Sequence, residues 1–111
     1  SFASTLGAEA RKAREQTFSE WRQEARQLLE TVQRECLQQA QQGCSAATVP
    51  LGHVDEECNH AGKAIFIKAE LESLLQPMGF SRCEICLTCL TAHDRTAESS
   101  YKLQGTFAWP V

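Results

Sequence analysis

The sequence lacks any apolar run near the roughly 20 residues that a membrane-spanning helix requires. Its longest notable run covers residues 64–67 and ends at Lys68. Residues 1–10 also lack the basic segment followed by an apolar segment that marks a signal peptide. Ser1 in place of Met is compatible with the removal of a leader. We therefore expect no membrane partner.

A dominant charge is missing as well, because 11 Lys and Arg stand against 14 Asp and Glu, for a formal net charge of −3. The basic residues of the first third alternate with glutamates, so no basic face forms there. Glycine-rich phosphate loops, nucleophile elbows, H-E-x-x-H helices and EF-hand loops are absent too. These absences argue against a nucleic-acid partner, predict no cofactor and leave no argument for an enzyme.

The overall composition is that of a globular chain, with 42% hydrophobic and 23% charged residues. A length of 111 residues is near the modal size of a domain and allows one modest core. We predict a single domain over residues 1–111, with residues 1–7 disordered.

Two segments have the three- and four-residue apolar spacing of a helix with one buried face. The first covers residues 8–42, contains neither proline nor glycine, and is followed by Gly43, which suits a left-handed helix end. The second covers residues 59–76 and is stopped by a proline and a glycine directly after it. The apolar stripe of the first consists of Phe18, Trp21, Ala25, Leu28, Leu29, Val32, Cys36, Leu37 and Ala40, and that of the second of Ala64, Ile67, Leu71, Leu74, Leu75 and Met78.

Three segments indicate strands. Residues 45–51 form a short one, which Pro50 restricts to an edge of the sheet or to a strand end. Residues 82–91 and 100–109 alternate apolar and polar positions, which is typical of a sheet with one dry face. The order α-β-α-β-β predicts an α+β fold, in which a long N-terminal helix and a second helix pack on one face of a small three-stranded, mainly antiparallel sheet.

The six cysteines carry the strongest chemical signal, because three of them recur at three-residue intervals in CEICLTC, residues 83–89. Two sulfurs three residues apart share a metal ion only where the chain turns tightly. In an extended strand, Cys83 and Cys89 lie about 20 Å apart and Cys86 points to the opposite face. We therefore predict that Cys83 and Cys89 belong to the core side of a strand and that Cys86 is an exposed thiol.

Alternative roles for the thiols stay open. Cys58, His60, Cys83 and Cys86 form a candidate metal site, and a small-ligand protein would use the thiols Cys58, Cys83, Cys86 and Cys89 in a pocket between helices and sheet. A thiol enzyme would use Cys58 or Cys86. The tripeptide His93-Asp94-Arg95 is a candidate anion or partner site, although polar residues are ordinary in a hairpin loop.

The leading functional hypothesis is a protein-interaction or self-associating module without catalysis. The first helix is too long for a compact domain of this size to cover, and we expect its stripe around Phe18 and Trp21 to meet a protein partner or a second copy. A small sheet also leaves edges open to another chain. We expect the thiols to be reduced and the protein cytoplasmic, or secreted if the cysteines are disulfide-bonded.

Overall fold

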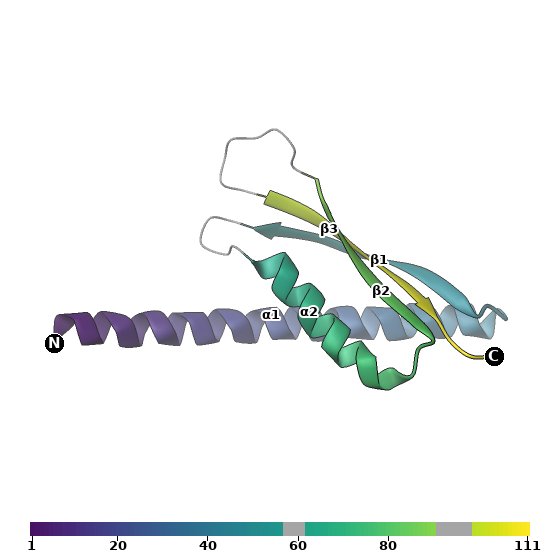
Figure 1. Ribbon diagram of the computed structural model, residues 1–111, viewed down its shortest axis with the longest axis horizontal. Coiled ribbons are helices and arrows are strands. Elements are labelled where there is room, and N and C mark those ends of the chain that lie inside the picture. The colour runs from purple at the N-terminus through teal and green to yellow at the C-terminus, as the bar shows by residue number, and fades with distance from the viewer. Residues whose placement is uncertain (57–61, 91–98) are drawn as a thin grey trace.

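The computed structural model describes residues 1–56, 62–90 and 99–111 (Figure 1). The two helices and three strands occur in the predicted order α-β-α-β-β. In chain order they are α1 (Phe2–Gln41), β1 (Ala46–Glu56), α2 (Lys63–Leu75), the short 3-10 turn η2 (Gln76–Met78), β2 (Arg82–Cys89) and β3 (Ser99–Ala108).

Helix α1 begins at Phe2, so the prediction of a helix starting at residue 8 after a disordered segment at 1–7 is corrected. The Ser1 hydroxyl accepts a hydrogen bond from the Ser4 N–H at 3.3 Å, which satisfies one of the unpaired donors of the first turn. Since no proline follows, nothing in the sequence interrupts the helix before residue 41.

The C-terminal end of α1 has the left-handed geometry that Gly43 predicts. Gly43 has a φ of +90°, in the left-handed region. The Gly43 N–H bonds to the Ala40 carbonyl and the Cys44 N–H to the Gln39 carbonyl, each at 3.0 Å. This pair of bonds satisfies the last carbonyls of the helix and turns the chain towards β1.

The sheet has the strand order β1-β3-β2, and both pairs are antiparallel. Pro50 lies in the edge strand β1, as predicted. Gly52 does not end that strand, however, and β1 continues to Glu56. The ladder shifts by one residue between Pro50 and Gly52, because Gly52 adopts a φ of +88° and forms a bulge rather than a turn.

Helix α2 is shorter than the predicted span of 59–76, beginning at Lys63 and continuing into η2. Gly62 occupies the position before it and supplies no side-chain cap. The cap comes from β1 instead, since the Glu56 carboxylate accepts the Ala64 N–H at 2.8 Å. This acceptor from a neighbouring strand ties the start of α2 to the end of β1.

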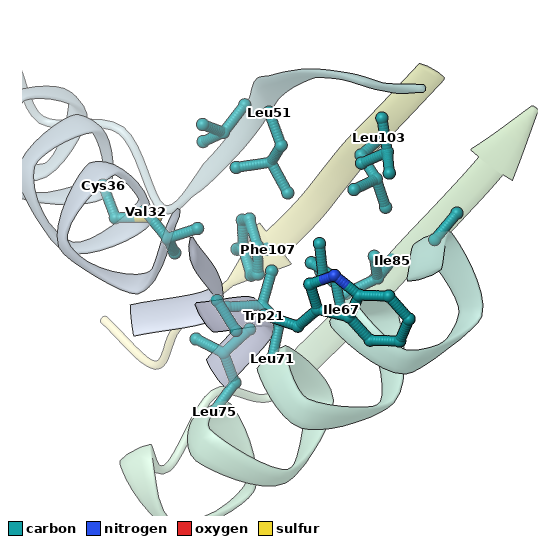
Figure 2. Close-up of a cluster of buried hydrophobic side chains, with 14 residues drawn as sticks. Trp21, Val32, Cys36, Leu51, Ile67, Leu71, Leu75, Ile85, Leu103 and Phe107 are labelled. Atoms are coloured by element: carbon teal, nitrogen blue, oxygen red, sulfur yellow. The ribbon is translucent and has the colours of Figure 1, made fainter. Parts of the chain in front are cut away.

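Both helices pack on one face of the sheet, and their apolar side chains meet those of the strands there (Figure 2). Phe107, in the central strand, is fully buried beneath the helices. The remaining core consists of Trp21, Ala25, Val32, Cys36, Val49, Leu51, Val54, Ala64, Ile67, Leu71, Leu75, Ile85 and Leu103. In the described part of the chain, neither helix has the length and apolar composition needed to cross a bilayer.

Strand β2 is less buried than its alternation predicts. Ile85 is buried and Leu87 is half-buried, but Cys83 and Cys89, on the same face, are exposed. The expectation that these two thiols are core residues is therefore corrected. The reason is that the helices cover β2 incompletely. An edge position alone does not expose side chains, because the other edge strand, β1, has Val49, Leu51 and Val54 buried against the helices.

Candidate functional site

The predicted interaction residues Phe18 and Trp21 lie where α1 meets α2. Trp21 is buried in the core, whereas Phe18 is 37% exposed. The Phe18 ring stacks on Phe66 of α2 at 5.3 Å between centroids and contacts Trp21 edge-on at 5.5 Å. Arg22 lies 6.0 Å above the Phe66 ring. The cluster thus joins the two helices, and Phe18 marks its solvent-facing border.

Beyond this cluster α1 leaves the body of the molecule. Residues 2–16 are exposed at every position, and Figure 1 shows the N-terminal part of α1 extending away from the sheet and α2. The molecule measures 62 × 34 × 17 Å and has a radius of gyration of 17.3 Å, against about 13 Å for a compact domain of this length. We call residues 2–16 the projecting segment.

The projecting segment carries apolar side chains without covering them. Phe2 is 77% exposed and Leu6, one turn later, is 54% exposed. They belong to an uncharged stripe with three- and four-residue spacing, bordered by Glu9 on one side and Arg14 on the other. We call this set the projecting stripe; it consists of Phe2, Ala3, Leu6, Ala10, Ala13 and Thr17.

A cleft of about 460 Å³ lies between α1, α2 and β1. Lys63 bonds to Glu24 across it at 3.1 Å, and His53 and Asp55 of β1 lie at its border. Asp55 already accepts a hydrogen bond from the Ser100 hydroxyl at 2.8 Å. None of the described residues that line this cleft is a cysteine, whereas a second hollow, beside α2 and β2, is lined by Cys83 together with Glu72, Ser73 and Gln76. The small-ligand pocket with Cys58, Cys83, Cys86 and Cys89 stays a prediction, because Cys58 lies outside the described residues.

The thiols of β2 lie on two faces of one strand. Cys83 shares the helix-facing side with Ile85, and Cys86, the next cysteine along the chain, lies on the outer face opposite Gln104 of β3. Among the described residues, no three His, Cys, Asp or Glu side chains converge as a metal site would require. Cys58 and His60, the other predicted ligands, lie outside the described residues, as does His93-Asp94-Arg95.

Two thiols on the helix-facing side have perturbed acidities. Burial, followed by the nearby Cys83 and Glu35, raises the pKa of Cys36 above its ordinary value. Burial and then Glu72 raise the pKa of Cys83. A raised pKa keeps a thiol protonated and weakly nucleophilic, which is the opposite of what thiol catalysis needs.

The exposed face of the sheet is polar and has one local charge pair. Arg82 donates to Glu84 at 3.0 Å along β2, and this hydrogen bond lowers the pKa of the Glu84 carboxyl. Thr48, Thr88 and Lys102 are exposed on the same face. This face is therefore solvated. The exposed large apolar side chains among the described residues are Phe2, Leu6, Phe18 and Leu37 of α1, Ile65 of α2, Met78 of η2, Leu90 and Val111.

Comparison with family models, with curated proteins and with solved structures finds no match for this chain. The fold itself defines a small two-layer α+β protein, with two helices on one face of a β1-β3-β2 antiparallel sheet. Its distinguishing surfaces are the projecting stripe of α1 and the edge strand β2. The periodicity of the sequence indicated that α1 is longer than a compact domain can cover. It placed the candidate contact at Phe18 and Trp21, because periodicity does not show where the helix leaves the rest of the molecule.

Proposed function

We propose that this chain is a non-catalytic protein-interaction module that binds a partner helix along the projecting stripe of α1. The observation that supports the proposal is the exposure of the whole projecting segment, including Phe2 and Leu6. Packing of an apolar face supplies most of the stability of helices in proteins. A helical extension of about 22 Å without such packing presents a face that a second helix would cover.

The composition of the stripe favours a helical partner. Between Leu6 and Thr17 the stripe contains only alanines, at residues 10 and 13. Small side chains let two helix backbones approach closely, and the larger Phe2 and Leu6 then serve as anchors one turn apart. Glu9 and Arg14 border the stripe with opposite charges, so a matching partner carries a basic residue on one side and an acidic residue on the other.

The test compares two variants that introduce the same residue on opposite sides of the projecting segment. Leu6→Glu places a charge on the stripe, while Arg11→Glu places it on the far side of the helix. Each full-length variant is used as bait in an extract of the organism that encodes the chain. We expect the wild type and Arg11→Glu to retain the same bound proteins and Leu6→Glu to lose them.

Site-specific photocrosslinking gives an independent measurement. A benzophenone amino acid at residue 6 should crosslink to the partner, and the same group at residue 11 should not. Equal crosslinking from both positions, or equal capture by both glutamate variants, would contradict the proposal. Circular dichroism of the two variants controls for loss of the helix itself.

A further inference from the structure

Strand β2 exposes main-chain groups along its outer edge. The Leu90 N–H bonds to the Ser100 carbonyl of β3 at 2.8 Å, in continuation of the β2–β3 ladder. In an antiparallel ladder, pairs with direct hydrogen bonds recur at every second residue. Residues 84, 86 and 88 therefore bond to β3, whereas Cys83, Ile85 and Leu87 direct their N–H and C=O groups away from it.

The other edge strand, β1, has protection that β2 lacks. Pro50 removes a donor from β1, and the bulge at Gly52 bends the strand. Over Arg82–Cys89 the sequence of β2 contains no proline, glycine or lysine, and its described register with β3 is unbroken. Among the described residues, β2 is therefore the less protected of the two edges.

The helical layer also stops short of β2. Leu87 is only half-buried and Cys83 is exposed, although both face the helices. On α2, Glu72 and Gln76 border a hollow with Cys83, which places this side of the helix beside the β2 edge. Ile65 lies two turns before Glu72 on the same side and is 67% exposed. Apolar surface thus remains uncovered in both layers at one border.

We propose that β2 pairs antiparallel with β2 of a second copy, around a two-fold axis at Cys86, to give one continuous six-stranded sheet. The strand is self-complementary about this axis. Ile85 pairs with Leu87 of the second copy through direct hydrogen bonds on the helix-facing side. Cys86 faces Cys86 of the second copy on the outer side, and Glu84 faces Thr88 of the second copy.

Charge disfavours the two axes on the N-terminal side of Cys86. A two-fold axis at Glu84 would place two carboxylates directly opposite each other, which destabilises a strand pair. An axis at Ile85 would leave the same carboxylates on a diagonal, about 7–8 Å apart. The axis at Cys86 separates them and centres the overlap on residues 82–90. A single strand pair is a small interface, so we expect an equilibrium between monomer and dimer in the micromolar range.

Light scattering of the full chain across the micromolar range tests the proposal with two lysine variants on the outer face. Cys86→Lys would oppose two ammonium groups at the axis, and Thr48→Lys makes a matched change at an exposed position of the protected strand β1. We expect dimers for wild type and Thr48→Lys, and monomers for Cys86→Lys with an unchanged circular dichroism spectrum. A monomeric wild type at high micromolar concentration, or a dimer of Cys86→Lys as strong as wild type, overturns the proposal.

Crosslinking tests the register. Opposed residues of a non-hydrogen-bonded pair have Cα atoms about 4.5 Å apart, within the range that a disulfide spans. Diamide would take two electrons and two protons from the two Cys86 thiols, joining their sulfurs while being reduced to the hydrazide. The same register places Cys83 opposite Cys89 of the second copy, so the experiment uses a Cys83→Ser/Cys89→Ser background. In that background we expect Cys86→Ser to abolish the covalent dimer and Cys44→Ser, at another exposed cysteine, to leave it. Crosslinking that depends on Cys44 and not on Cys86 contradicts the register.

The inference uses a different surface from the projecting stripe, and the same assay separates the two proposals. Leu6→Glu leaves the β2 edge intact and should retain the dimer. If Leu6→Glu dissociates the dimer and Cys86→Lys does not, the edge pairing fails and self-association belongs to the projecting stripe. If Cys86→Lys alone dissociates it, the edge pairing holds whatever partner α1 binds.

Discussion

Gly105→Ala is the substitution for which the structure makes the sharpest quantitative prediction. Gly105 lies in the central strand β3, between Val49 of β1 and Ile85 of β2. A methyl group at this position would overlap Cζ of Phe107, lie 2.5 Å from its Cε2, and lie 3.3 Å from Cδ1 of Ile85. The Phe107 ring, fully buried, therefore occupies the space that a side chain at residue 105 would need.

The magnitude follows from two opposing effects. The Phe107 ring must move by about 1 Å to regain contact distance, and extra methyl groups in a packed core typically cost about 1–3 kcal/mol. Replacing glycine by alanine in a strand recovers roughly 0.5–1 kcal/mol of backbone entropy. Because the steric cost is larger, we expect a net loss of about 1–2 kcal/mol in the free energy of unfolding.

Urea denaturation of the full chain measures this loss, and Gly7→Ala is the matched control. Gly7 lies in the projecting segment and has open space around its added Cβ, so the same substitution should change the free energy of unfolding by no more than about 0.5 kcal/mol. Phe107→Leu in the Gly105→Ala background should recover part of the loss, because it removes the overlapping ring atoms. A Gly105→Ala protein as stable as wild type would refute the packing argument.

Three further predictions concern other contacts. Glu56→Ala should lower the free energy of unfolding by about 1 kcal/mol, because it removes the acceptor of the Ala64 N–H at the start of α2. Asp55 accepts a hydrogen bond from Ser100 on the outer face, so Asp55→Ala should lower the free energy of unfolding by less in the same urea titration. The raised pKa values of Cys36 and Cys83 predict a contribution to the free energy of unfolding that is complete below the ordinary thiol pKa of 9.0. This contribution is lost as the pH rises through the folded-state pKa values, because the thiols of the unfolded chain release their protons first. A Cys36→Ala/Cys83→Ala protein that lost as much stability in alkali would contradict this assignment. Deleting residues 1–14 should change the free energy of unfolding by no more than about 0.5 kcal/mol relative to wild type, because the projecting segment is exposed throughout. A large drop in the thermal midpoint would show instead that the segment packs on the body.

Local chemistry explains which parts of the fold were predictable. Gly43 was identified as a helix end because a left-handed residue suits glycine, and Pro50 was assigned to an edge because it cannot donate to a ladder. The same reasoning failed at Gly52, where the prediction ended β1. A glycine with positive φ serves a turn or a bulge equally well, and the pairing of β1 with β3, far along the chain, decides between them.

The exposure of the apolar side chains of α1 was only partly predictable for a similar reason. The apolar spacing of α1 is nearly continuous from Phe18 to Ala40, so periodicity does not distinguish Trp21, which the body buries, from Leu37, which is 59% exposed. The cysteines of β2 show the complementary error. Alternation placed Cys83 correctly on the helix-facing side, but its burial depended on whether the helices extended over β2.

The sequence by itself determined the element types, their order and the faces of the strands, because these depend on periodicity and on residues with restricted backbone geometry. Only the tertiary structure shows that β3 is the central strand, that β1 and β2 are the edges, and that the body of the protein ends near Phe18. These outcomes depend on contacts between segments distant in the chain, and local patterns do not record which segments meet. The run CEICLTC illustrates the difference: its alternation is a property of the sequence, whereas the exposure of Cys83 and Cys89 depends on how far the helices cover β2.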